Sequence, residues 1–337
     1  GLEVPLSTSC NLPKLGENCQ LWVYTKVRED AIKLYGFSNE EQKKVFAILI
    51  GINGVGPKVA LAILSSLSVS ELKSVVESNR IDILTNVPGI GKRTGEKIVL
   101  EEGLLGPEIS ILAISDGEKA VALSPAQDFK RLHNNDLGPN TGGMGAYSPV
   151  PIASDGLVED VLNNFIQPTI AALRQRGIDY RGVLYAGLMI TEDGPKLLEY
   201  NVRFGDPEAQ VVLPRFESSL TELLIEASRG EIQTPPRFTN DAMVTVVCAT
   251  EGYPVSPRVG DRITGMEEAS SSKGIEKVYV AGISLDEQQQ PVTAGGSVLA
   301  VTGRGVTIES ARQNAYTGAE KIHWEGLHKR QDIAEGI

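Results

Sequence analysis

The stretch that decides the fold of the larger part of the chain is residues 198–208, which read LEYNVRFGDPE. An apolar segment at 183–190, VLYAGLMI, precedes it, and the pair Asp193-Gly194 lies between the two. Two β-rich runs that flank an Asp-Gly pair predict antiparallel strands joined by a tight turn. We therefore expect a β-hairpin here, with residues 198–208 continuing from its second strand.

The polar residues of this second strand suggest a metal and phosphate site. Glu199 and Asn201 are two residues apart, so on a strand their side chains point to one face, and Arg203 has the same parity. A carboxylate and an amide oxygen suit Mg²⁺ that already carries nucleotide phosphates. Arg203 would then counter charge on a transferring phosphoryl group. For the Glu-x-Asn pair alone, an ordinary polar strand edge is the favoured interpretation.

Outward from this hairpin, residues 101–230 alternate between strand-like and helix-like runs. Residues 109–114 (ISILAI) predict a strand, and residues 160–176 form an amphipathic helical pattern. This alternation is typical of an α/β or α+β domain.

Two further clusters in this region could carry chemistry. Residues 127–131 (QDFKR) precede the glycine-rich residues 138–145 (GPNTGGMG), which suit a flexible cover over phosphates. Residues 101–108 (EEGLLGPE) would present backbone groups to adenine and Glu108 to ribose hydroxyls. The alternatives are a common glycine-rich loop for the first cluster and a helix end with a glycine stop for the second.

The first hundred residues have a different pattern. Residues 1–30 contain short β-rich runs, and a helical pattern begins near Asn39. Residues 53–62 (NGVGPKVALA) and 87–97 (VPGIGKRTGEK) then repeat a Gly-x-Gly turn followed by a lysine. Such turns bring backbone amides at a helix N-terminus close to a phosphate, so the tandem copies predict sequence-independent contacts to a DNA backbone. The residues concerned are Gly54, Gly56, Lys58, Gly89, Gly91 and Lys92.

Composition separates the same two regions. The net charge of the 337 residues is −11, but residues 1–100 carry 12 Lys and Arg against 10 Asp and Glu, and the remainder 20 against 33. The whole chain is therefore no general polyanion binder. The three cysteines have no metal-ligand spacing, and no apolar run approaches the length of a membrane helix. We expect reduced thiols in a cytoplasmic protein without a membrane partner.

The first hundred residues resemble the Holliday-junction-binding protein RuvA. The resemblance rests on residues 27–31 (VREDA), residues 34–37 (LYGF) and the two glycine turns, in that order. It implies a partial OB-type β-barrel, a tandem helix-hairpin-helix domain and binding of four-way DNA. It also implies that Glu29 and Asp30 form an acidic pin at the junction centre.

Residues from about 101 to the C-terminus resemble glycinamide ribonucleotide synthetase, an ATP-grasp family. Residues 138–149 and 203–208 are the most specific stretches, and Phe129 departs from the family's usual histidine. The resemblance implies ATP-dependent ligation of glycine to 5-phosphoribosylamine through glycyl phosphate, with ATP and Mg²⁺ or Mn²⁺. It implies that Glu199 and Asn201 hold the metal and that Arg203 is catalytic. The implied nucleotide contacts are Glu101, Glu102, Leu104 and Glu108, and the phosphoribosyl contacts are Asn140, Thr141 and Gly142.

Taken together, these resemblances predict a chimera whose two parts join between residues 97 and 103. No Pro-, Gly- and Ser-rich linker is found there. The expected fold class is multidomain α+β: a partial OB-type barrel, a helix-hairpin-helix domain, a partial ATP-grasp domain and a small C-terminal α/β domain. The expected boundaries are 1–34, 35–100, 101–233 and 234–337.

Three functional hypotheses remain open at this point. The chain is a purine-biosynthesis ligase, a DNA-junction-binding module, or a chimera in which neither part acts. Because the family's N-terminal domain and first ATP-grasp subdomain are not recognisable in the sequence, we expect little ligase activity from the chain alone. Unpaired strand edges in both parts would favour homo-oligomers.

Overall fold

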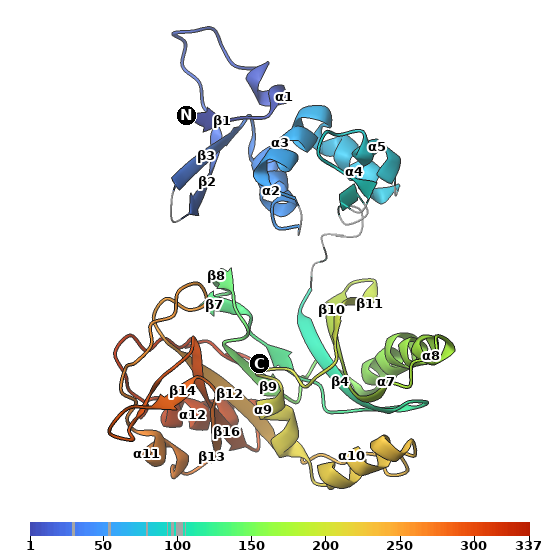
Figure 1. The fold of residues 1–337 in the computed structure, drawn as a ribbon, viewed down its shortest axis with the longest axis vertical. Coiled ribbons are helices and arrows are strands. Elements are labelled where there is room, and N and C mark those ends of the chain that lie inside the picture. Colours follow the sequence, from blue (N-terminus) through green and yellow to red (C-terminus); the bar gives the residue numbers. More distant parts are fainter. Residues whose placement is uncertain are drawn as a thin grey trace. The chain divides into compact units, whose positions relative to one another are not determined.

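The computed structural model describes residues 1–28, 31–52, 55–78, 80–92, 94–95, 98, 104 and 106–337 (Figure 1). The chain divides into two compact units, Gly1–Leu104 and Leu105–Ile337. Among the described helices, none is by itself long and apolar enough to cross a membrane. One bent pair, Pro57–Ser66 with Val69–Val76, meets that test by length and composition only.

The first unit combines a small sheet with short helices. Its sheet has the order β1-β3-β2, with β1 parallel and β2 antiparallel to β3. The described strands form an open sheet, so the expected OB-type barrel is not seen as a closed barrel. The elements are β1 (Leu2–Glu3), α1 (Leu6–Ser9), β2 (Trp22–Arg28), β3 (Ala31–Phe37), α2 (Glu40–Leu49), α3 (Pro57–Ser66), α4 (Val69–Glu77) and α5 (Ile81–Thr85).

Aromatic packing joins the sheet of this unit to its helices. The ring of Phe46 on α2 lies 4.9–5.5 Å, between centroids, from those of Tyr24, Tyr35 and Phe37. The predicted helix start near Asn39 is confirmed, because the Asn39 side chain accepts the Gln42 backbone N–H at 2.8 Å. Helix α2 therefore packs on the sheet, and α3 packs against α2.

The second unit begins with a four-stranded antiparallel sheet of order β11-β10-β4-β5. The predicted hairpin and the predicted strand at 109–114 are confirmed as β10, β11 and β4. Helices α7 and α8 cover one face, where Tyr200 of β11 donates to the Phe165 carbonyl at 2.9 Å. The elements are β4 (Glu108–Asp116), β5 (Ala120–Ala122), α7 (Asp155–Val161), the π-helix η1 (Leu162–Ile166), α8 (Gln167–Gln175), β10 (Arg181–Thr191), β11 (Gly194–Asn201) and α10 (Leu220–Arg229).

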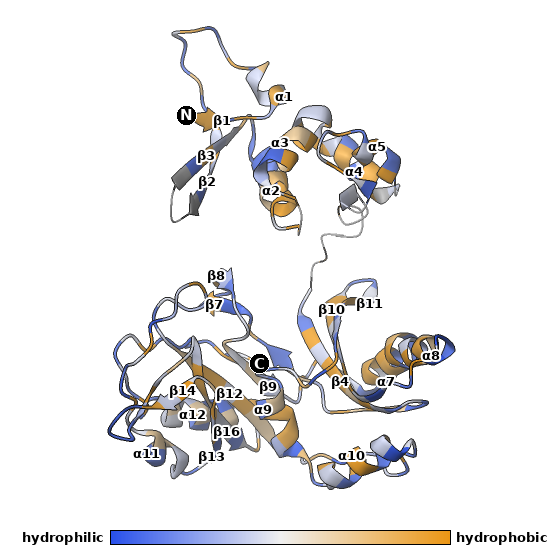
Figure 2. Ribbon diagram, in the orientation of Figure 1, coloured by the Kyte–Doolittle hydropathy of each residue, from blue (hydrophilic) through white to orange (hydrophobic). Residues whose placement is uncertain are grey.

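A five-stranded sheet, β13-β16-β12-β9-β6, forms the remainder of this unit. Its central strand β12 is buried at every position and is coloured mainly as hydrophobic in Figure 2. Helix α12 packs on β16 and β12. The elements are β6 (Gln127–Asp128), β7 (Arg131–His133), β8 (Leu137–Asn140), β9 (Gly145–Ser148), α9 (Ala209–Val212), the 3-10 helix η2 (Leu213–Arg215), β12 (Ala242–Ala249), α11 (Met266–Ser270), β13 (Ile275–Val280), β14 (Ile283–Leu285), β15 (Pro291–Thr293), β16 (Ser297–Gly305) and α12 (Ile308–Ala319).

A buried arginine, Arg215 in η2, hydrogen-bonds to several segments of the second unit. Arg215 donates to the Ser148 hydroxyl at 2.9 Å, to the Asp241 carbonyl at 3.0 Å and to the Ser124 hydroxyl. Burial lowers the pKa of Arg215 to about 10, although the nearby Asp241 opposes this change. Arg215 nevertheless satisfies buried oxygens on several segments of the second unit and so connects these segments.

Candidate functional site

The face of the four-stranded sheet opposite helices α7 and α8 gathers polar side chains in register. Glu199 on β11 lies opposite Gly187 on β10, which in turn lies opposite Ser110 on β4. Asn201 pairs with Tyr185 one step along the same face. A bulge in β11 beside Gly187 interrupts the alternation, but Glu199 and Asn201 still share the face.

Glu199 and Asn201 contact each other directly. The Asn201 amide donates its Nδ2 hydrogen to Glu199 Oε1 at 3.1 Å, which leaves the amide oxygen and Glu199 Oε2 for a cation. Both metal-ligand atoms would be oxygens, which are the ligand atoms that Mg²⁺ and Mn²⁺ prefer. Within the described residues, no group of three or more His, Cys, Asp or Glu is placed to hold a metal. The pair therefore fits a metal whose other ligands come from a nucleotide and water.

Arg203 differs from its predicted placement. Strand β11 ends at Asn201, so the strand alternation does not extend to Arg203. Its side chain is exposed, and its guanidinium donates to the Phe204 carbonyl at 2.8 Å. The strand alternation therefore does not settle whether Arg203 shares the face of Glu199 and Asn201.

Lys130, which was not among the individually predicted site residues, lies between β6 and β7. Lys130 contacts Asp128 at 2.8 Å and Glu108 at 3.0 Å. Burial alone would lower the pKa of Lys130, but the charges of Asp128 and Glu108 raise it above its ordinary value. Burial raises the pKa of Asp128, and Lys130 opposes this change. Lys130 therefore stays protonated between two carboxyl groups, one of which is the predicted ribose contact Glu108.

A second buried group, also not selected from sequence, lies next to this cluster. Glu208 is 3% exposed, and its Oε1 accepts hydrogen bonds from Tyr185 at 2.8 Å and Ser110 at 3.0 Å. Burial raises the pKa of Glu208, and the charge of Asp128 raises it further. Two features of the sequence could have pointed to Glu208. Ser110 is a polar residue within the apolar run 109–114, and Glu208 ends the stretch 203–208, one of those most specific to the resembled family.

Lys130, Asp128 and Glu108 line a cleft of about 420 Å³. The other groups described above, Glu199, Asn201, Arg203 and Glu208, are not among its lining residues. Predicted residues Glu108 and Asn140 both line it, so the structure brings a predicted nucleotide contact and a predicted substrate contact together. Its lining is Gly106, Pro107, Glu108, Gln127, Asp128, Phe129, Lys130, Arg131, Asp136 and Asn140.

The loop that follows Asn140 is held by hydrogen bonds to residues outside it. Thr141 donates through its backbone to the Lys130 carbonyl at 2.7 Å, and the Gly142 N–H donates to the Tyr253 hydroxyl at 3.0 Å. Neither Thr141 nor Gly142 lines the cleft. Of the other predicted nucleotide contacts, Leu104 belongs to the first unit, and Glu101 and Glu102 lie outside the described residues.

The first unit contains a separate lysine-lined pocket of about 190 Å³. Lys26 and Lys33 are directly opposite each other on β2 and β3, and Lys58 in the first turn of α3 lines the same pocket. Glu3, 3.4 Å from Lys33, is the one acidic residue in this described lining. Like charges on facing strand positions repel, so the pocket has excess positive charge.

Some of the predicted DNA contacts of this unit are among the residues that the structure describes. Gly56 precedes α3 as its N-cap, and Gly89 has a positive φ of +91° that favours glycine. A Cβ on Gly89 would lie 3.4 Å from the Val59 side chain, so the second glycine turn packs beside α3. Gly91 and Lys92 are exposed. Gly54 and the predicted acidic pin, Glu29 and Asp30, lie outside the described residues.

Two family profiles match this chain over most of its second unit. The phosphoribosylglycinamide synthetase ATP-grasp (A) domain matches residues 53–209, and the C domain of the same synthetase matches residues 243–336. A phosphoribosylamine–glycine ligase from Vigna unguiculata is 43% identical over 235 residues, 69% of this chain and 76% of that protein. The chain belongs to the phosphoribosylglycinamide synthetase family.

Other members of the synthetase family are similar over the same region. The phosphoribosylamine–glycine ligase of Streptomyces coelicolor is 45% identical over 241 residues, covering 71% of this chain and 58% of that protein. The crystal structure of the Thermotoga maritima phosphoribosylamine–glycine ligase has a TM-score of 0.60 and 38% identity, covering 68% of this chain and 56% of that one. The chain thus spans little more than half the length of these synthetases.

The beginning of the chain is similar to a different family. The profile of the RuvA N terminal domain matches residues 1–36. The synthetase match begins at residue 53, earlier than the expected residue 101, so it includes both glycine turns. The comparisons therefore support the synthetase domains and a short RuvA-like beginning, whereas a chimera and a helix-hairpin-helix domain stay predictions.

Proposed function

We propose that the second unit contributes to ATP-dependent ligation of glycine to 5-phosphoribosylamine in purine biosynthesis. In this reaction the glycine carboxylate receives a phosphoryl group from ATP. The amine nitrogen then forms a bond to the carboxyl carbon while the carbon–oxygen bond to phosphate breaks. The observation that carries the proposal is the Glu199–Asn201 pair, an oxygen-donor pair on a sheet face in a synthetase-family chain.

The cofactors of the proposed reaction are ATP with Mg²⁺ or Mn²⁺. We assign Glu199 and Asn201 to the metal, and Arg203 to the transferring phosphoryl group. Glu108 uses Oε2 for Lys130, which leaves Oε1 to accept a ribose hydroxyl. Glu101, Glu102 and Leu104 would contact adenine, and Asn140, Thr141 and Gly142 the phosphoribosyl substrate.

Within the same proposal, the two units subdivide into four domains. Residues 1–34 would be an OB-like remnant and residues 35–100 a helix-hairpin-helix domain. Residues 101–233 would be the second half of an ATP-grasp domain and residues 234–337 the synthetase-type C-terminal domain. The observed division after Leu104 is consistent with the middle boundary.

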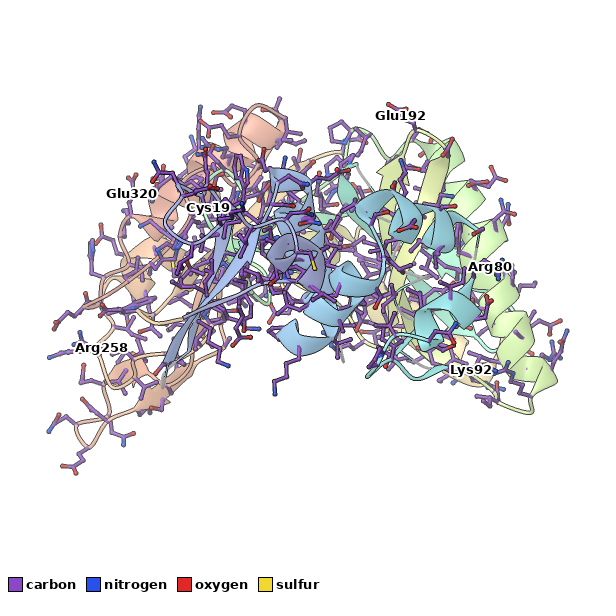
Figure 3. All side chains as sticks on the ribbon, turned by 90° about the horizontal axis from the view of Figure 1, so that it is seen from above. Cys19, Arg80, Lys92, Glu192, Arg258 and Glu320 are labelled. Atoms are coloured by element: carbon purple, nitrogen blue, oxygen red, sulfur yellow. The ribbon has the colours of Figure 1, made fainter. Side chains whose placement is uncertain are left out.

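Metal-dependent nucleotide binding tests the ligase proposal without requiring turnover. Titration calorimetry with ADP, with and without Mn²⁺, should give binding that depends on the metal. Glu199→Gln should weaken it about tenfold or more, because an amide replaces the charged ligand. Glu192→Gln is the matched control, since Glu192 is an exposed acid in the turn of the same hairpin (Figure 3). Equal affinity of both variants, or no Mn²⁺ dependence, would contradict the assignment.

A second candidate function, binding of a DNA backbone by the first unit, rests on the lysine-lined pocket and the RuvA-like beginning. Phosphates of four-way DNA would neutralise the facing lysines. Fluorescence anisotropy should show affinity that falls steeply with salt and is lowered by Lys58→Gln. Lys14→Gln, an exposed lysine outside the pocket, is the control. If neither nucleotide nor DNA binds, the third hypothesis, a chain in which neither part acts, gains support.

A further inference from the structure

The segment at residues 328–333 lies along the β7–β8 hairpin and is bound to it by polar contacts. The centre of these contacts is Arg330, which is 1% exposed. Its guanidinium donates two hydrogen bonds to Asp332, at 2.8 and 2.7 Å, one to Asp136 at 2.7 Å and one to the Arg131 carbonyl at 3.1 Å. It also stacks over the Phe129 ring at 5.0 Å. One side chain thus joins the C-terminal segment to the start of β7 and to the turn of the hairpin.

Neighbouring residues repeat this attachment. The Asn135 N–H donates to Asp332 at 2.7 Å, and the Gln331 N–H donates to the Asn134 side chain at 2.9 Å. His328 Nε2 lies 2.9 Å from the Leu132 carbonyl. Every part of the hairpin between its two strands therefore has a partner in the C-terminal segment.

Leu132 of β7 packs against the hydrophobic core, but the turn and β8 are exposed. Residues 133–140 are all exposed, so they bury no apolar side chain of their own. Asn135 and Asp136 have φ values of 58° and 51°, in the left-handed region, which asparagine and aspartate adopt more readily than other residues with a Cβ. Both residues take part in the attachment, through the Asn135 backbone and the Asp136 carboxylate. The exposed turn is thus attached to the rest of its unit by polar contacts to the C-terminal segment.

The same hairpin forms one wall of the cleft. Arg330 touches Phe129, Arg131 and Asp136, and all three residues also line the cleft. Asn140, at the end of β8, lines it too. A displacement of the hairpin would therefore move a wall of the cleft and the start of the Asn140–Gly142 loop together.

We propose that Arg330 is a positioning residue, which fixes the β7–β8 wall so that the cleft binds a phosphorylated sugar. This inference rests on the proposed function for the identity of the ligand, but the positioning itself is independent of it. Lysine cannot replace arginine here, because one ammonium cannot make the bidentate contact to Asp332 and also reach Asp136 and the Arg131 carbonyl. The C-terminal segment thereby sets ligand affinity in a site built mainly by the ATP-grasp residues.

A matched control separates positioning from general stability. Arg312 donates to the Ile333 carbonyl at 3.0 Å and to the Gln331 carbonyl at 2.8 Å, and lies over the Tyr316 ring at 4.9 Å. It holds the same C-terminal segment, but its polar and ring contacts within the described residues include no hairpin residue. Arg312→Lys should loosen the segment without releasing the hairpin.

Hydrogen exchange by mass spectrometry on the full chain tests the inference. In Arg330→Lys, amides of residues 131–142 should exchange about tenfold faster than in the wild type, whereas Arg312→Lys should leave them near the wild-type rate. Asp136→Asn, which removes one partner that is 66% exposed, provides a milder variant should Arg330→Lys fold poorly. Unchanged exchange in both hairpin variants, or equal acceleration in Arg312→Lys, would overturn the inference.

Affinity for ribose 5-phosphate, measured by calorimetry on the same proteins, tests the link to the ligand. We expect at least fivefold weaker binding in Arg330→Lys and little change in Arg312→Lys. Faster exchange with unchanged affinity would overturn the proposed link. Faster exchange in a protein whose wild type does not bind the probe would support the positioning and count against the proposed function instead.

Discussion

At the scale of single residues, the buried carboxyl of Glu208 makes the clearest prediction. Its pKa is raised above the ordinary 4.5 by burial, so the folded state binds its proton more tightly than the unfolded state. Its contribution to the free energy of unfolding is therefore fullest below pH 4.5 and is lost as the pH rises through the raised pKa. Glu208→Gln should remove this loss. The melting temperature of the variant relative to the wild type should therefore rise as the pH increases above 4.5.

The control for this prediction changes the same network in the opposite direction. Tyr185 donates to Glu208 and thereby favours its charged form. Tyr185→Phe should raise the pKa of Glu208 further, so the decline of stability with pH should become steeper. A difference between Glu208→Gln and wild type that is constant with pH would show that the carboxyl does not titrate in this range.

The cysteines differ in reactivity for a related reason. Cys248 is buried on β12, and burial raises the pKa of its thiol to about 12. Cys10, at the end of α1, and Cys19, before β2, are both exposed; Cys19 is labelled in Figure 3. Because the thiolate is the nucleophile, native protein should react with iodoacetamide at two positions and unfolded protein at three. Peptide mass spectrometry measures this, and rapid native labelling of Cys248 would contradict the buried placement.

At the scale of elements, close packing of α12 on β16 depends on Gly303. A Cβ at this position would lie 2.3 Å from the Ala311 carbonyl oxygen and the Ala315 nitrogen, both of which are backbone atoms. Gly303→Ala should therefore force the helix from the sheet and lower the free energy of unfolding by about 1–3 kcal/mol. Gly156→Ala on α7 is the control, because only the Ser154 hydroxyl lies within 4 Å and alanine favours a helix. It should stabilise by about 0.5 kcal/mol; urea midpoints that move equally would contradict the packing argument.

Elements are also the scale at which sequence reasoning worked. The hairpin of β10 and β11, the strand at 109–114 and the helix start at Asn39 follow from local periodicity, turn residues and capping, and all were predicted. The neighbouring pair Glu199 and Asn201 was found for the same reason. The strand alternation was extended to Arg203 because nothing local marks the end of β11 at Asn201, and the role of Arg203 stays a prediction.

The remaining site residues could not be found this way, because their contacts are distant in sequence. Arg330 and Asp136 are 194 residues apart, and Ser110 and Glu208 are 98 apart. No spacing rule links such residues, and each taken alone has the composition of an ordinary polar position. Lys130 was visible beside the glycine-rich loop, but only the fold shows it between Asp128 and Glu108.

At the scale of the whole molecule, the two units have separate hydrophobic cores. One buried cluster, which includes Phe46, draws only on residues 35–98. The other two, one of which includes Val246, draw only on residues 109–334. No buried apolar residue of the described chain is shared between them, so the main stabilising term of each unit is independent of the other.

Calorimetric unfolding of the full chain should therefore show two transitions that respond separately to core substitutions. Phe46→Ala removes an aromatic ring that is fully buried and should shift only the transition of the first unit, by the equivalent of about 3–5 kcal/mol. Val246→Ala, also fully buried, should shift only the other transition. Mn²⁺ with ADP should raise that second transition alone, since ligand binding to the folded state stabilises the unit that holds the site. A single transition that moves with both substitutions would mean that the units unfold as one, and the Gly1–Leu104 segment would then have to be counted as part of the synthetase fold.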